Sequence, residues 1–299
     1  MFVETGQIIP VAPFDFTRSQ RFLGSFAPME GEQTTTGQSL TKALFAAGQL
    51  VLVQLTSTGT IEQPRLDYTL HSEKAISKTV KEAAIERMSF FLSLEDDLRP
   101  FYEIAQEDSD FAPVVRDLYG YHQVKFGTPF ENGCWAILSQ RNPRTMAQRM
   151  KRALLETYGA SIELDGTRYW AFPEPAHLAG VSEADLFKTI RNTLKAERLY
   201  GVVQAFQDVD ETYLRNADYD EVDAWLRSIR GFGEWSASFV LLRGLGRMDR
   251  VPLDEKALLA AASRLYGHGQ ELTRAQVAAL AERYGPDKGY WAHYLRVGA

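Results

Sequence analysis

Cysteine is almost absent from this sequence, since Cys134 is the only one among 299 residues. A single thiol excludes an internal disulfide, a cysteine-ligated zinc site and a cysteine-ligated iron–sulfur cluster. The five histidines are scattered along the chain, and no two of them stand at the spacing of a metal-ligand pair. We therefore expect no metal site built from side chains.

Long apolar runs are also missing. The longest, Leu50 to Leu55, is interrupted by Gln54 and is too short to span a bilayer. The segment from Met1 to Phe16 has no basic region and does not resemble a signal peptide. The hydrophobic share of 45% and the charged share of 24% are those of an ordinary globular protein. These features predict a soluble cytoplasmic protein with no membrane partner.

Basic residues are outnumbered, and the formal net charge is −6. Taken alone, this balance argues against a nucleic-acid partner, but binding depends on where the charges lie. Residues 95–110 are strongly acidic, whereas residues 140–152 contain no acid and carry Arg141, Arg144, Arg149, Lys151 and Arg152. The basic stretch is compatible with a solvated helix face and with a nucleic-acid contact.

The pattern of predicted secondary structure changes after about residue 88. Before it, β-branched and apolar runs broken by Gly and Pro predict strands over 8–16, 49–59 and 64–70. Helices are expected at 41–47 and 73–92, which gives an α+β N-terminal domain with a small antiparallel sheet.

Beyond residue 88 the helical period dominates and the strand signal nearly disappears. Short loops of Gly, Pro, Asp and Asn separate the expected helices, which lie at 94–105, 129–140, 142–159, 182–206, 219–229, 234–247, 254–267 and 274–285. The fold class expected is an α+β N-terminal domain followed by a mainly α part.

The most informative segment is Leu226 to Phe239, in which a Gly-Phe-Gly turn joins two helices. Gly231 and Gly233 permit positive φ and leave no Cβ in the way of a close approach. Backbone N–H groups at the start of the second helix would then face outward, an arrangement that binds phosphate oxygens without reading sequence. A plain helical hairpin with a Gly turn is the alternative.

The longer pattern is more specific. Leu–x–x–Ile–x–Gly–Phe–Gly–x–Trp–Ser–Ala is followed by Leu-Arg-Gly-Leu-Gly-Arg and then by Val251-Pro-Leu-Asp254. It resembles the motif of the helix-hairpin-helix DNA glycosylase superfamily, in which the trailing aspartate is catalytic. The resemblance implies that Asp254 stabilises the oxocarbenium charge on the sugar and orients the attacking water. Asp254 would also suit the N-cap of the next helix, and Asp249 is a competing carboxylate.

One hairpin position separates the subclasses of this superfamily. Members that also cut the strand resemble one another in a Lys two residues after the second Gly, which forms a Schiff base with the sugar. Here that residue is Trp235, so water should be the nucleophile. The pattern is similar to bacterial 3-methyladenine DNA glycosylase II, and the resemblance implies a base pocket of Trp235, Phe239 and Trp291. Aromatic walls suit cationic alkylated purines, although core packing is the alternative reading.

Other segments resemble the superfamily at corresponding places. Gln140 and Arg141 match its Gln and its strand-separating wedge, which is often Leu in the alkyl-purine subgroup, and Asn142 is placed to contact the opposite strand. The resemblance implies further DNA contacts from Arg243 and Arg247, beside Gly231 and Gly233. The opening PFDF…RFL also looks like the start of the α+β domain of the alkyl-purine and oxidised-guanine enzymes.

These features together predict three structural units: residues 1–88, residues 125–245 with the hairpin, and residues 89–124 with 246–299. The resemblance implies a monofunctional DNA glycosylase that flips damaged bases, alkylated purines above all, out of duplex DNA in base excision repair. It implies a monomer at the bacterial nucleoid, with no cofactor other than a monovalent cation that the hairpin carbonyls are able to bind. An oxidised-guanine glycosylase and a non-catalytic DNA-binding protein are the alternatives.

Overall fold

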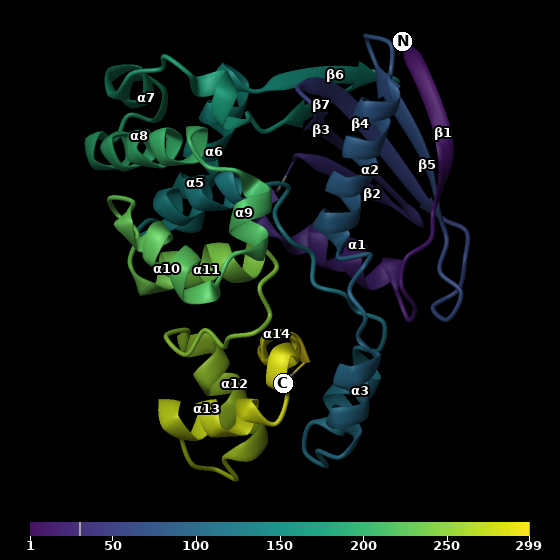
Figure 1. The fold of residues 1–299 in the computed structure, drawn as a ribbon, viewed down its shortest axis with the longest axis vertical. Coiled ribbons are helices and arrows are strands. Elements are labelled where there is room, and N and C mark those ends of the chain that lie inside the picture. The colour runs from purple at the N-terminus through teal and green to yellow at the C-terminus, as the bar shows by residue number, and fades with distance from the viewer. Residues whose placement is uncertain (30, 299) are drawn as a thin grey trace.

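The N-terminal part of the computed structural model, which describes residues 1–29 and 31–298, is built on an antiparallel sheet (Figure 1). Its five strands lie in the order β1-β5-β4-β3-β2. Their bounds are β1 Phe2–Ile8, β2 Gln33–Thr36, β3 Ser39–Ala46, β4 Gln49–Ser57 and β5 Leu66–Ser72. Two helices accompany the sheet, α1 (Phe16–Ser25) and α2 (Lys78–Leu92), and α2 packs on β3 and β4.

Two local predictions for this domain were wrong. Residues 41–46 of the expected helix form most of β3 instead, because they pair with β4 and are bounded by turns at Gly37 and Gly48. Cross-strand pairing outweighs the helix propensity of Lys-Ala-Leu in such a short run. The strand expected at 8–16 is shifted to β1, and α1 begins at Phe16 behind the side-chain cap of Asp15.

The rest of the chain is mainly helical, as predicted. The helices are α3 Arg99–Gln106, α4 Ala112–Asp117, α5 Pro129–Ser139, α6 Arg144–Tyr158, α7 Glu183–Ile190, α8 Thr193–Gln207, α9 Glu211–Asn216, α10 Tyr219–Ser228, α11 Glu234–Arg243, α12 Lys256–Tyr266, α13 Arg274–Glu282 and α14 Lys288–Gly298. The helix predicted at 182–206 is two helices, because Arg191 adopts a left-handed φ of 54° and Asn192 caps α8. No helix within the described residues is long and apolar enough to cross a membrane.

A two-stranded hairpin in the middle of the helical part escaped prediction. Strands β6 (Ala160–Leu164) and β7 (Thr167–Ala171) turn at Asp165 and Gly166, both at positive φ. Ile162 and Ala171 pack with Phe45 of β3, so the hairpin extends the apolar contact of the main sheet. Its strands are too short and too polar to show a clear alternating pattern.

Helix α5 links the sheet to the helices that carry the candidate site. Every residue from Pro129 to Leu138 is buried, because α6, α8 and α11 all pack against it. Thr128 caps the helix and Pro129 occupies its first turn, where the missing N–H costs nothing.

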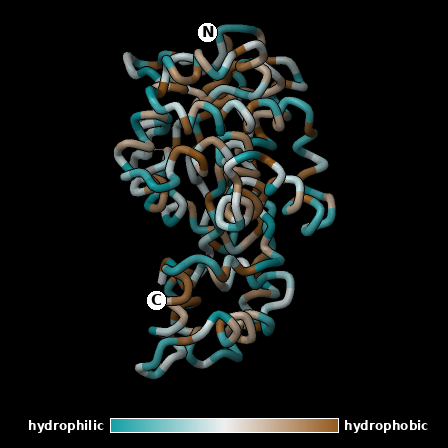
Figure 2. The backbone as a smooth tube through the Cα atoms, turned by 90° about the vertical axis from the view of Figure 1, so that its left-hand side faces the viewer, coloured by the Kyte–Doolittle hydropathy of each residue, from teal (hydrophilic) through white to brown (hydrophobic). Residues whose placement is uncertain are grey.

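A second apolar core lies below the first, built from α3, α4 and the C-terminal helices α12, α13 and α14. Figure 2 shows this lower unit with the C-terminus among its helices and with apolar segments running through both units. The chain crosses between the units three times, after Leu94, around Tyr121 and after Leu245. Residues from both units therefore meet where these crossings lie.

Candidate active site and nucleic-acid interface

The helical hairpin forms as the sequence predicts. Helix α10 ends at Ser228, and α11 begins at Glu234. Ile229 and Phe232 are buried on either side of Gly231, and the Phe232 N–H donates to the Ile229 carbonyl at 2.9 Å. The apolar pair anchors the turn, so the backbone between the helices is presented at the surface.

The two glycines have different roles. Gly231 has a φ of 96°, and a Cβ there would lie 2.6 Å from Cδ of Arg198. Gly233 has a φ of −112°, so the prediction of a positive φ was wrong for this residue. A Cβ at Gly233 would meet no heavy atom within 4 Å among the described residues, and no side chain there caps α11. The first turn of α11 therefore keeps N–H groups that are available to a phosphate.

Replacing each glycine by alanine should separate these roles. We expect Gly231→Ala to lower stability by about 1–2 kcal/mol or more, because alanine is strained at positive φ and would press on Arg198. Gly233→Ala should leave stability nearly unchanged but weaken duplex binding, because its methyl group points into open space where a phosphate would approach. Thermal unfolding and fluorescence anisotropy measure the two effects. Unchanged duplex affinity in Gly233→Ala would contradict the phosphate contact.

The loop between α5 and α6 is fastened to the hairpin by Gln140. The Gln140 amide donates to the Gly231 carbonyl at 2.8 Å and to the Ser236 hydroxyl at 2.9 Å, and it accepts from Arg198 at 2.7 Å. Lys195 donates to the carbonyls of Ile137 and Gln140, which fixes the end of α5. Burial lowers the pKa of Lys195 to about 8. The partly buried Gln140 therefore fixes the position of the loop relative to the hairpin.

Arg141 stands at the tip of this loop. Its side chain is exposed, its φ is 53°, and it lines an open depression together with Gln140, Gly231 and Trp235. The neighbouring Asn142 amide donates to the Leu138 carbonyl at 2.8 Å and is only partly exposed. Of the three loop residues predicted to touch DNA, Arg141 is the one that projects from the surface.

Trp235 and Phe239 form an aromatic surface on α11. Their rings are stacked 5.2 Å apart with an interplanar angle of 8°, and Trp235 is 40% exposed. Phe239 is half-buried and packs edge-on against Phe126. Core packing thus accounts for the placement of Phe239 but leaves a large apolar face of Trp235 in solvent, a feature typical of a ligand-binding surface.

Asp254 lies in the turn before α12 and does not cap it, because the helix starts one residue later than the sequence suggests. Glu255 occupies the N-cap position and forms a paired contact with Arg296, at 3.0 and 2.9 Å. Burial raises the pKa of Asp254, and the charges of Glu234 and Glu255 add to this rise. Since Glu234 is the first residue of α11, Asp254 lies close enough to the N-terminal turn of the hairpin helix for the two charges to interact.

Two predicted site residues are placed elsewhere. Trp291 is fully buried in the second core, stacked on Tyr284 and donating to the Tyr266 hydroxyl at 3.1 Å. Its prediction as a pocket wall was wrong, because no part of the ring reaches the surface. Arg243 is 4% exposed, with its guanidinium over the rings of Phe22 and Phe26. Its prediction as a phosphate contact was wrong for the same reason.

The Arg247 guanidinium is engaged in contacts within the protein. Its guanidinium donates to the Ala217 carbonyl at 2.8 Å and lies 3.4 Å from the Asp249 carboxylate. Asp249, the competing carboxylate, is therefore paired with an arginine. Among the described residues Asp254 has no ion-pair partner, and the nearby Glu234 and Glu255 are both acidic.

Sequence reasoning missed the contribution of α1. Phe22 and Phe26 of this helix are half-buried, stand 4.7 Å apart, and approach Tyr121 and Phe126. They come from the N-terminal domain yet lie beside α11, because Arg243 packs on both rings. The PFDF…RFL resemblance was the signal available, but helix position alone does not say what a side chain contacts.

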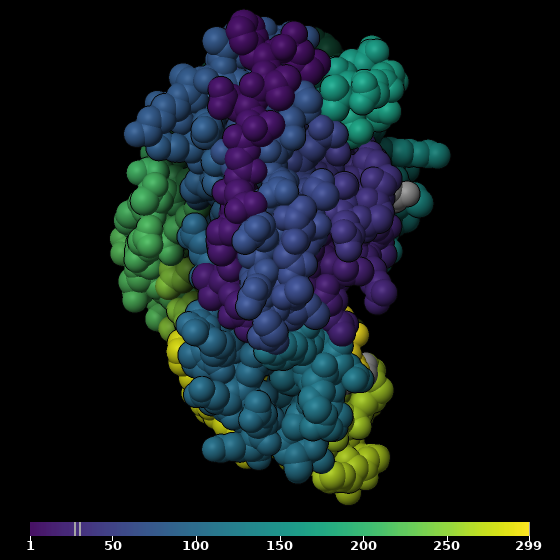
Figure 3. Space-filling model, turned by 90° about the vertical axis from the view of Figure 1, so that its right-hand side faces the viewer, coloured from purple at the N-terminus to yellow at the C-terminus, as the bar shows by residue number. Residues whose placement is uncertain are grey.

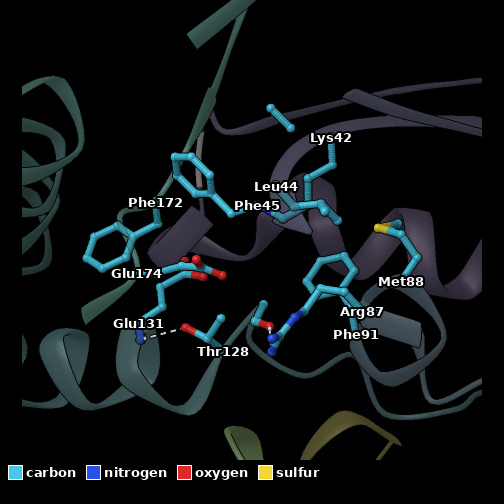
Figure 4. A pocket seen from close by; sticks show the side chains of 12 residues that line it. Lys42, Leu44, Phe45, Arg87, Met88, Phe91, Thr128, Glu131, Phe172 and Glu174 are labelled. Atoms are coloured by element: carbon cyan, nitrogen blue, oxygen red, sulfur yellow. Dashed lines mark hydrogen bonds between the residues drawn. The ribbon is translucent and has the colours of Figure 1, made fainter. Parts of the chain in front are cut away.

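A separate cavity lies away from the hairpin, between the sheet, α2 and the start of α5 (Figure 4). Figure 4 shows the carboxylates of Glu131 and Glu174 turned toward its centre, with Arg87 and Phe91 on the opposite side. Glu131 also binds the Lys151 ammonium at 2.7 Å, so it belongs to a buried ionic cluster that joins α5 and α6 to the N-terminal domain. This cavity contains none of the residues of the hairpin.

The side chains offer no metal site, as far as the described residues go: no three of the His, Cys, Asp and Glu side chains gather closely enough. The hairpin carbonyls of Ile229 and Gly231 already accept hydrogen bonds from Phe232 and Gln140. The turn therefore holds its shape through protein contacts, and a monovalent cation at these carbonyls stays a prediction.

Comparison with known proteins finds relatives that are named DNA glycosylases. A search of protein-family models finds no match. The DNA-3-methyladenine glycosylase of Bacillus subtilis is 26% identical over 228 residues, which cover 76% of this chain and 75% of that protein. DNA-3-methyladenine glycosylase 2 of Escherichia coli is 30% identical over 162 residues, about half of each chain at 54%. This chain is similar in sequence to bacterial DNA-3-methyladenine glycosylases.

Solved structures of DNA glycosylases share the whole fold. The 3-methyladenine DNA glycosylase of Archaeoglobus fulgidus aligns with a TM-score of 0.79 at 20% identity, covering 98% of this chain and 97% of that one. The 8-oxoguanine glycosylase/lyase of Clostridium acetobutylicum aligns with a TM-score of 0.71 at 17% identity, over 100% and 99% of the two chains. The predicted fold class is thereby confirmed.

Proposed function

We propose that the protein is a monofunctional DNA glycosylase that removes damaged bases, alkylated purines above all, from duplex DNA. The observation that carries this proposal is the pairing of an exposed aromatic surface, Trp235 on Phe239, with the half-buried Asp254 carboxylate at the same end of α11. The sequence relatives named 3-methyladenine glycosylases support the substrate class. Solved relatives bound to DNA support the partner.

Binding begins at the backbone of the duplex. The uncovered first turn of α11, next to Gly233, holds a phosphate through its N–H groups without reading sequence. The exposed Arg141 at the tip of its loop enters the stack and fills the gap that the flipped nucleotide leaves. Gln140 keeps this loop and the hairpin in one fixed arrangement.

Base release then relies on stacking and on charge. The flipped base lies against the face of Trp235, which suits both neutral and cationic rings. As the N-glycosidic bond breaks, positive charge develops on the sugar, and the Asp254 carboxylate stabilises it and orients the attacking water. The products are the free base and an abasic site in an intact strand.

A trapping experiment separates this chemistry from that of the oxidised-guanine glycosylase/lyases, which share the fold. Trp235 stands at the hairpin position of the Schiff-base lysine, so no amine is offered to the sugar there. Incubation with damaged duplex and borohydride should yield free base but no covalent protein–DNA adduct. A stable adduct would overturn the monofunctional assignment, and base release from no damaged duplex would favour the non-catalytic DNA-binding alternative.

The site is assembled within one chain, so we also propose that the enzyme acts as a monomer, in association with the nucleoid. Residues from α1, α11 and the turn before α12 meet without a second copy.

A further inference from the structure

Three exposed arginines stand at the start of α6 without a partner inside the protein. They are Arg141, Arg144 and Arg149, and we call them the free arginines. In the part of the chain that the structure describes, none of the three forms a hydrogen bond or an ion pair, in contrast to Lys151 of the same basic stretch. Arg141 is already assigned to the gap in the base stack, but Arg144 and Arg149 have no role in the fold or in the proposed chemistry.

The placement of Arg144 is unfavourable in the protein by itself. It is the first residue of α6, where the positive end of the helix dipole lies, and neither an acid in the first turn nor a side-chain cap offsets its charge. Positive charge also gathers close by, since burial lowers the pKa of Lys195 to about 8 and the charges of Arg198 and Arg141 add to this effect. In a chain of net charge −6, such a local concentration of positive charge favours an anionic partner.

Arg144 and Arg149 lie on the other side of α5 from the hairpin helix. Helix α5 packs against both α6 and α11, and Figure 1 shows it between them. Figure 3 shows teal atoms, the colour of residues near 150, projecting from the same edge of the molecule that carries yellow-green atoms of the C-terminal unit. Asp254 acts on the damaged nucleotide from the α11 side. A duplex whose damaged strand lies along α11 therefore brings its other strand to the α6 side of Arg141.

We propose that Arg144 and Arg149 bind phosphates of the undamaged strand, opposite the flipped nucleotide. The inference rests on the proposed glycosylase function and adds a contact for the second strand. Along α6 the two residues are about 7.5 Å apart, close to the rise of about 7 Å over two nucleotides of one strand. Their guanidinium groups donate to phosphate oxygens without reading sequence. The hairpin then holds one strand and α6 the other, with Arg141 between them, which favours duplex over single-stranded DNA.

The salt dependence of duplex binding tests the two contacts. The probe is a duplex with a stable abasic-site analogue, titrated by fluorescence anisotropy at several salt concentrations. Each lost phosphate contact lowers the slope of log affinity against log salt by about 0.9 for duplex DNA, so Arg144→Gln/Arg149→Gln should lower it by about 1.8. For the analogue-containing strand alone the variant should keep the natural slope, because the undamaged strand is absent.

Arg152→Gln/Arg168→Gln is the matched control. It removes the same two charges, but each of these arginines has a carboxylate partner, Glu156 at 2.7 Å and Glu163 at 3.9 Å. Arg152 also lies over the ring of Trp170. The control should therefore keep the slope of the natural protein. An equal fall in slope for both double variants would show a general effect of net charge and would overturn the proposal.

Neutral methylphosphonate linkages identify the strand. Placed in the undamaged strand opposite the abasic-site analogue, they should weaken binding by the natural protein but not by Arg144→Gln/Arg149→Gln. Placed in the damaged strand, they should weaken binding by both proteins. Coupling of the two substitutions to the damaged strand, or an unchanged salt slope, would overturn the proposal. Failure of the natural protein to release any base would instead overturn the glycosylase function and leave these binding results unaffected.

Discussion

Asp254→Asn is expected to slow base release by about a hundredfold to ten-thousandfold, the range that a positioned carboxylate contributes to such chemistry. Asparagine keeps the shape of the side chain but supplies no negative charge to the developing oxocarbenium ion. Duplex binding should change little, because the contacts to phosphate come from the hairpin and its neighbouring loop. Single-turnover base release and an anisotropy titration measure the two quantities.

The same variant should be at least as stable as the natural protein. Burial and the charges of Glu234 and Glu255 raise the pKa of Asp254, so in the folded state the ionised form is disfavoured. This cost is present in full above the raised pKa and disappears as the pH falls below the unfolded value of about 4. Asp254→Asn should therefore gain stability at neutral pH, and the gain should shrink in acid.

Asp249→Asn provides the matched control for the catalytic assignment. Asp249 is the other aspartate near the hairpin, and it is paired with Arg247. We expect this variant to release base at nearly the natural rate. If Asp254→Asn kept full activity and Asp249→Asn were inactive, Asp249 would be the catalytic residue, and the assignment to Asp254 would be refuted.

Lys151→Met is expected to have the largest effect on stability. The Lys151 ammonium is 2% exposed, binds Glu131 at 2.7 Å, and pairs closely with Glu32. It also donates to the Pro28 carbonyl at 2.7 Å. Removing it leaves two buried carboxylates without their shared cation, which costs about 3–5 kcal/mol. Urea unfolding at pH 7 measures the loss.

The pH dependence of Lys151→Met separates loss of charge from loss of packing. Burial raises the pKa of Glu32 already, and without Lys151 both glutamates should protonate more readily. The destabilisation should therefore become smaller as the pH is lowered. Arg149→Met, on the exposed side of the same helix, should stay within about 0.5 kcal/mol of the natural protein. If both variants lost a similar amount of unfolding free energy, the ion pairs of Lys151 with Glu131 and Glu32 would contribute nothing beyond the helix propensity of the replaced residue.

The hairpin could be predicted because local sequence determines it. Gly231 needs its φ of 96°, Ile229 and Phe232 anchor the turn, and a short loop brings Asp254 back toward α11. The long amphipathic helices were equally accessible, since their period is set by packing on one face. The ends of the helices were harder to predict, as the break between α7 and α8 at Arg191 shows.

What could not be predicted depends on which residue faces which neighbour. Arg243 and Lys151 occur in basic segments that suggest DNA contacts, yet both are buried by partners distant in the sequence, Phe22 and Glu32 among them. Trp291 has the right residue type for a pocket wall but lies in the interior of a core. Phe22 reaches α11 only through the packing of two domains, which no local pattern encodes.

The most direct test of the central claim is the release of free base from a duplex with a single 3-methyladenine. The natural protein should release the base at a rate that Asp254→Asn does not approach, and the damaged strand should stay intact until alkali cleaves the abasic site. Release of no base from this duplex, or release accompanied by strand cleavage without alkali, would contradict the account.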